Sequence, residues 1–250
     1  KILFLGLLLS CFVISCGDDD NSSNGSTSIT QDEARVNAKI DAANDDVSDI
    51  VEAQFEATES DVSGRSAAGA VSVNLPACAT VTRNPEFGTP ITAGTQVTKT
   101  IDFGTTGCAM ANGNVLKGKI IVTFTYNPEA TSHTINYQFD NFYHNSIKLT
   151  GNKTFTRTMS IATDISPSHP IVVMNMQMTA TFPDGRVFTR TGNRTREIIE
   201  GMNTPAFFGD NKYRVTGSWT TTFPNTTVQT STITTPIIVR MSCANQHKPL

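Results

Sequence analysis

Val172–Arg186 reads VVMNMQMTATFPDGR, and two features of this stretch specify a β-hairpin. Apolar and polar residues alternate along most of it, which is the pattern of a strand with one buried face. Pro183-Asp184-Gly185 follows at once, and these residues supply the fixed and the positive φ angles of a tight turn. Strands joined by so short a turn are antiparallel.

Three further segments repeat the period of two and extend the prediction to a whole sheet. They run over 119–126, 134–140 and 213–223, with turn-forming residues between them. The fold is therefore predicted to be mainly β, a long antiparallel meander of roughly nine strands over 77–250. We expect an open curved sheet or a flattened barrel, and a domain cut short at its C-terminal end.

One amphipathic helix is predicted ahead of the sheet, over residues 30–60. Thr30 and Glu33 have the spacing of a capping box, in which each side chain satisfies a backbone N–H group. The opposite faces are acidic and apolar, and the apolar stripe consists of Val36, Ile40, Ala43, Val47, Ile50, Val51 and Phe55. Such a stripe packs more often on the domain's own core than on a partner helix, so the helix is expected to lie on one face of the sheet, joined to it by a linker over 61–76.

The net charge of −3 conceals an acidic arm and a basic body. Residues 17–63 contain 13 acidic and 2 basic residues, a balance of −11, whereas residues 64–250 contain 9 acidic and 16 basic residues, a balance of +7. Two interpretations follow: the arm docks on the body, or the body presents a surface for polyanions.

Six basic residues recur at even spacing and are predicted to share one face of two neighbouring strands. They are Arg186, Arg190, Arg194, Arg196, Lys212 and Arg214. This stripe is a solvated sheet face, the dock for the acidic helix, or a binding surface for a polyanion such as an acidic glycan, lipopolysaccharide or extracellular DNA. It indicates no specific nucleic-acid recognition.

The cysteines predict one disulfide within the β domain. Cys78 and Cys108 flank the first β segment, and closing their loop would stabilise an exported protein by about 3 kcal/mol. Cys243 then has no partner in the chain. It would gain one if it began a second copy of the Cys78–Cys108 segment, with the closing cysteine beyond residue 250.

No pattern in the chain specifies a catalytic or metal site. The four histidines stand singly, without the spacing of a zinc site, and the chain lacks a Gly-x-Ser-x-Gly or phosphate-binding loop. Asp102 and Asp140 are conceivable as a carboxylate pair, but each lies in a context typical of turns and strand ends. We therefore expect no enzymatic activity, no cofactor and no metal.

Lys1 and the apolar run Leu3–Ile14 predict an export signal. The run has the length of a signal-peptide core and is too short to span a bilayer as a helix. It ends in Val13–Cys16, a Val-Ile-Ser-Cys sequence that resembles the lipobox of bacterial lipoproteins. That resemblance implies a signal peptide over 1–15, a lipid on Cys16 that anchors the protein to a membrane, and a flexible acidic tether over 16–29. Cleavage elsewhere is the alternative; Cys11 lies inside the apolar core and lacks a polar flank.

The residues after Cys16 and the body carry two further resemblances. Asp18–Asp20 resembles the acidic export tag of Bacteroidetes-type surface lipoproteins. The body resembles a group of uncharacterised Bacteroidetes-type lipoproteins over most of residues 78–243. The motifs are Ile101–Gly104 with Cys108, Gly118–Thr123, Phe139–Tyr143 and Lys148–Gly151. Together they imply a β-rich protein, lipid-anchored in the outer membrane and facing the cell exterior, and they transfer no functional residue.

Two functions remain open from the sequence. The first is a non-catalytic role in binding, adhesion or envelope structure. The second is a carrier or chaperone that holds a lipid or another apolar ligand between the helix and the sheet. Met174, Met176 and Met178 bear on this choice, because a methionine row beneath a helix fills an irregular core or lines a cavity. Such a row could also bind copper, since methionine sulfur suits soft metals, but core packing is the favoured interpretation. A large apolar void would favour the carrier, and a filled core would favour the binding protein.

Overall fold

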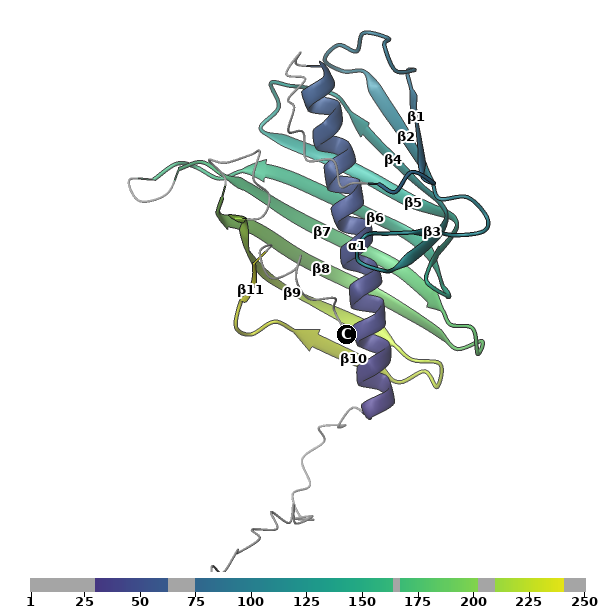
Figure 1. Cartoon of the computed structure of the whole chain (residues 1–250). Helices are drawn as coiled ribbons and strands as arrows, with labels where there is room; N and C mark the ends of the chain where they lie inside the picture. Colours follow the sequence, from purple (N-terminus) through teal and green to yellow (C-terminus); the bar gives the residue numbers. More distant parts are fainter. Residues whose placement is uncertain (1–29, 63–74, 164–166, 202–209, 241–250) are drawn as a thin grey trace, which may run out of the picture.

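The structure, a computed structural model, describes residues 30–62, 75–163, 167–201 and 210–240 (Figure 1). Within these ranges it contains one helix, α1 (Gln31–Val62), and eleven strands. The strands are β1 (Thr80–Asn84), β2 (Gln96–Asp102), β3 (Cys108–Ala109), β4 (Val115–Thr125), β5 (Ser132–His144), β6 (Ile147–Met159), β7 (Pro170–Thr181), β8 (Val187–Glu200), β9 (Lys212–Thr222), β10 (Val228–Thr232) and β11 (Ile237–Arg240). The predicted signal peptide, Cys16, the tether, most of the linker and Cys243 lie outside the described residues.

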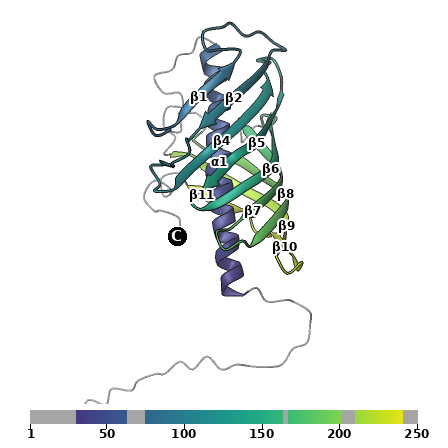
Figure 2. The ribbon, with the colours of Figure 1, turned by 90° about the vertical axis from the view of Figure 1, so that its right-hand side faces the viewer.

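All eleven strands belong to one antiparallel sheet. Its order is β1-β2-β4-β5-β6-β7-β8-β9-β10, with β3 added beside β4 and β11 beside β9. In the described part of the chain β1 and β10 do not pair, so the sheet stays open (Figure 2). The predicted meander is confirmed, and of its two forms the open curved sheet is the one adopted. Phe182 N donates to Arg186 O across the predicted Pro-Asp-Gly turn (2.9 Å).

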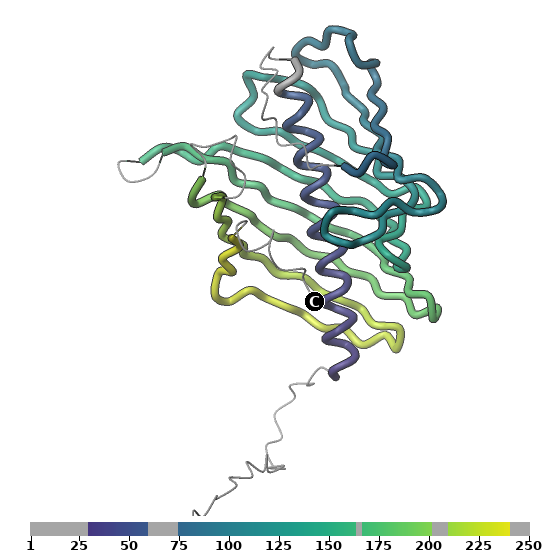
Figure 3. The backbone as a smooth tube through the Cα atoms, in the orientation of Figure 1, coloured from purple at the N-terminus to yellow at the C-terminus, as the bar shows by residue number. Residues whose placement is uncertain are grey.

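The helix begins at the predicted capping box. Glu33 N donates to Thr30 Oγ1 (3.2 Å), and Thr30 N donates to Glu33 Oε2 (2.8 Å). From there α1 runs across the strands on one face of the sheet, from the β10 edge towards β1 and β2 (Figure 3). The molecule therefore has two layers, and the other face of the sheet carries no helix in the described chain.

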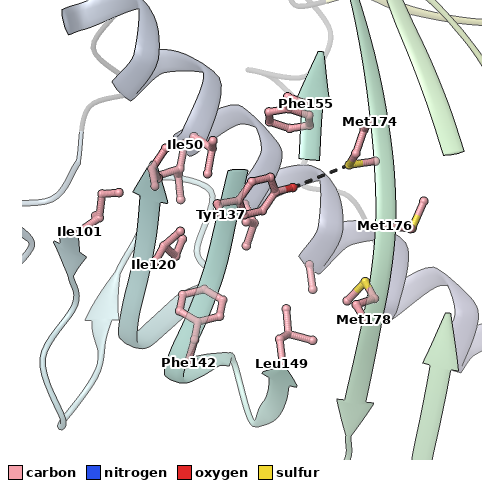
Figure 4. Packing of buried hydrophobic residues seen from close by; sticks show 14 of the residues in the cluster. Ile50, Ile101, Ile120, Tyr137, Phe142, Leu149, Phe155, Met174, Met176 and Met178 are labelled. Carbon is pink, nitrogen blue, oxygen red and sulfur yellow. Dashed lines mark hydrogen bonds between the residues drawn. The ribbon is translucent and has the colours of Figure 1, made fainter. Parts of the chain in front are cut away.

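The apolar stripe of α1 forms the middle of the core. Every residue predicted for the stripe is at most 3% exposed. Phe55 meets Phe124 of β4 edge to face, with ring centroids 5.0 Å apart. The methionine row of β7 lies in the same core, where Tyr137 Oη donates to Met174 Sδ (3.7 Å; Figure 4). The methionines thus fill the space between sheet and helix.

The predicted disulfide is present. Cys78 and Cys108 are bonded, with Cα atoms 5.7 Å apart. The bond ties the segment before β1 to the short strand β3, which pairs with β4. It therefore fixes the segment that leads into β1 to the β3–β4 pair.

Shortening one helix residue at the core tests this packing. Ile50 is 1% exposed, and Ile50→Ala should lower the free energy of unfolding by about 2–5 kcal/mol, because it leaves a cavity that neighbours fill only partly. Chemical denaturation followed by circular dichroism measures the change. Lys39→Ala on the exposed side of α1 is the control, expected within about 0.5 kcal/mol of the wild type. Equal losses in the two variants would contradict the proposed packing.

Candidate functional site

The arginines of β8 lie directly beneath α1. Alternation along the strand points Arg190, Arg194 and Arg196 to the helix side, where they stand opposite Thr221, Gly217 and Val215 of β9. Arg186 belongs to the preceding turn and reaches the first turn of the helix, with Nη1 2.6 Å from Asp32 Oδ2.

Each of these arginines pairs with the acidic face of the helix. Arg190 and Arg194 share the carboxylate of Asp41, and Arg194 Nη1 also lies 2.8 Å from Asp45 Oδ1. Further along, Arg196 holds Asp49 (2.6 Å) and Glu52. The acidic residues recur about once per helical turn, so one row of guanidinium groups meets one row of carboxylates.

Burial and ring contacts hold the guanidinium groups in place. Arg190 is 1% exposed and donates to Asn37 Oδ1 (2.6 Å) and Thr221 Oγ1 (3.1 Å). The guanidinium of Arg194 lies 4.3 Å from the ring centre of Trp219. This approach depends on Gly217, because a Cβ there would lie 2.8 Å from Arg194 Cα and its φ of +149° disfavours other residues. Of the three interpretations of the stripe, docking of the acidic helix is therefore the one that this geometry supports for these residues.

Lys212 and Arg214 do not belong to this row. The register places Arg196 opposite Val215 and Glu197 opposite Arg214, so Arg214 lies on the other face of the sheet. There it pairs with Glu197 (2.5 Å), and Lys212 pairs with Glu200. The prediction of one six-residue stripe was wrong at these two positions, because even spacing within a strand does not specify the face of the next strand.

Two buried lysines, which the sequence reasoning missed, extend the polar contacts of α1. Lys99 Nζ donates to the backbone oxygen of Gln54 (2.7 Å), and Lys153 Nζ donates to Asn44 Oδ1. Burial lowers the pKa of Lys153 from 10.5 to about 7. The alternation along each strand could have revealed them, because each lysine occupies a position at which the strand otherwise places buried apolar residues.

A histidine of β5 contacts the middle of α1, away from the arginines of β8. His144 Nε2 lies 2.8 Å from Asp46 Oδ2, and Asp46 also accepts from Asn112 (3.0 Å) and Asn114 (2.7 Å). The other described histidines also face carboxylates: His133 faces Glu59 and His169 faces Glu197. Among the described residues, no three His, Cys, Asp or Glu side chains are grouped as a metal site.

The two aspartates considered as a carboxylate pair are separated by a lysine. Asp102 lies opposite Lys119, and Lys119 lies opposite Asp140 on the next strand. Lys119 Nζ is 3.5 Å from Asp102 Oδ2. The three side chains form a charged row at one end of the helix-free face.

The space between helix and sheet is largely filled. Two hollows of about 250 Å³ and about 190 Å³ lie towards the two ends of α1. The larger is lined by Val36, Phe188 and Phe223 together with Arg186, and the smaller by Glu52, Arg196 and Tyr213 among others. The methionine row lines neither hollow and belongs to the packed core.

Comparison of the chain with protein-family models, with curated proteins and with solved structures found no match. Within the described ranges, no helix has both the length and the apolar character needed to cross a bilayer. α1 itself is 32 residues long, and its exposed side is charged.

The shared carboxylate of Asp41 is the most sensitive point of the dock. Asp41→Asn removes the charge that faces two guanidinium groups and should lower the free energy of unfolding by about 3 kcal/mol, because a buried charge then lacks its partner. Asp45→Asn is the matched control one turn along: Asp45 is 62% exposed and, within the described chain, forms an ion pair only with Arg194, so its loss should cost less than about 1 kcal/mol. Urea denaturation compares the two variants, and a smaller effect at Asp41 would contradict the dock.

Lys153 should make stability depend on pH. The folded protein releases this proton near pH 7 and the unfolded chain near 10.5, so the unfolded state binds more protons between these values and stability rises with pH. The free energy of unfolding of the wild type should therefore increase relative to that of Lys153→Met between pH 6 and pH 9. Denaturation curves at half-unit pH steps measure the difference, and parallel profiles would contradict the assignment.

Proposed function

We propose that this protein is anchored by a lipid on Cys16 to the outer membrane, faces the cell exterior, and has a non-catalytic role in binding, adhesion or envelope structure. The observation that carries the proposal is the ion-paired and closely packed interface between α1 and the sheet. The chain runs from the lipobox and the tether straight into Thr30, where the helix is capped. Because the ion-paired helix occupies one face, the opposite face of the sheet is the broad surface left for a partner.

The charge distribution supports the same role. The acidic arm identified in the sequence engages the arginines of the body, so Arg190, Arg194 and Arg196 have their charge already compensated. An acidic glycan would have to displace these carboxylates to bind there. We therefore propose that the arginine row serves to hold the sheet against the acidic helix α1.

The carrier function is the second candidate. The apolar row of Met174, Met176 and Met178 would suit an acyl chain, but the described hollows lie beside it and measure only about 250 and 190 Å³. A larger ligand would require α1 to leave the sheet and break the contacts of Arg190, Arg194 and Arg196. The filled core favours the binding protein.

Labelling and protease treatment of intact cells test the anchor and its orientation. Labelled palmitate should enter the wild type and Cys11→Ala, and Cys16→Ala should lose the label, because the lipobox resemblance designates Cys16 alone. Added protease should digest the wild type on intact cells. Label retained by Cys16→Ala would refute the lipid site, and protection from protease would refute the exterior location.

A further inference from the structure

The face of the sheet opposite α1, called here the open face, carries short uncharged polar side chains in register. One row of paired positions crosses eight strands from β2 to β10 and contains only Thr, Asn and Ser. It consists of Thr98, Thr123, Asn136, Thr154, Asn175, Asn193, Ser218 and Thr232.

Amide side chains are concentrated at the centre of this face. Two neighbouring rows on β5 to β8 contain six of them, called here the amide patch: Asn136, Gln138, Asn152, Asn175, Gln177 and Asn193. All six are exposed. Asn136 accepts from Thr154 Oγ1 (2.9 Å), whereas the other five amides bond to no side chain within the described chain. Their donors and acceptors therefore face outwards.

Strand propensity explains only part of this composition. Threonine favours strands, but asparagine is depleted in them, and here it occupies central positions of four neighbouring strands. Charge is also missing, although charged residues make up about a quarter to a third of a typical soluble surface. On β4 to β10 of the described sheet, charged residues of this face stand only towards the ends. Lys117, Lys119, Asp140 and Lys148 lie at one end, and Glu197, Glu200, Lys212 and Arg214 at the other.

We propose that the open face binds a neutral polysaccharide through the amide patch and the threonines around it. Amide and hydroxyl groups both donate and accept hydrogen bonds, as do sugar hydroxyls, and the uncharged centre offers nothing to hold a polyanion. The strands are about 4.8 Å apart, close to the length of one sugar unit in an extended glycan. Because the sheet twists, a flexible hydrated chain fits it better than a flat crystalline surface. This inference rests on the proposed function, since it names the partner of the exposed domain.

Affinity electrophoresis of the detergent-solubilised full-length protein tests the inference. The gels contain dextran, laminarin, galactomannan or xylan as neutral probes, and alginate or heparin as anionic probes. The wild type should be retarded by at least one neutral glycan. Asn175→Thr combined with Asn193→Thr should weaken that retardation about tenfold, because each lost hydrogen bond weakens binding by several-fold. Threonine preserves strand propensity at both positions.

Gln96→Thr on β2 is the matched control, because it removes an exposed amide from the same face outside the patch. It should bind like the wild type. The inference is overturned if no neutral glycan retards the wild type, if only the anionic probes do, or if the double variant binds normally. None of these outcomes bears on palmitate labelling or protease digestion, so failure here leaves the surface anchor to its own test.

Discussion

The shared carboxylate of Asp41 is the interaction on which the arrangement of helix and sheet depends. It lies between Arg190 and Arg194, and Arg190 is almost completely buried. Removing charges from water is costly, so such pairs contribute less to net stability than to selecting one arrangement over others. Apolar packing alone would allow α1 to shift along the methionine row. We interpret the row of arginines as the element that fixes where the helix lies.

The docked helix also determines how the domain meets its surroundings. α1 begins at the end of the segment proposed as the membrane tether and crosses the sheet to the disulfide-linked edge. Contacts from Asp32 at one end to Gln54 towards the other join it to the sheet along its length. α1 and the sheet therefore behave as one body, and the open face lies on the side away from the helix.

The two faces of the sheet follow different chemistry. The face beneath α1 combines large apolar residues with cations that reach acids and amides of the helix. The centre of the open face is rich in threonine, asparagine and glutamine, and its charges lie towards the ends. Alternation along each strand keeps these two sets apart. One strand can thus contribute Arg194 to the dock and Asn193 to the surface.

Local patterns in the chain determined most of the fold. The period of two, the Pro-Asp-Gly turn, the capping box and the stripe from Val36 to Phe55 each specify structure from neighbouring residues, and so these elements were predictable. The pairing of Cys78 with Cys108 followed from their places beside the first β segment. The candidate site was only half predictable: its arginines were identified, and the acidic helix was one of three interpretations of what they meet, but the individual ion pairs and the separate position of Arg214 were not predicted. Cross-strand register and the path of α1 over the sheet decide which side chains meet, and both arise from contacts between residues far apart in the chain.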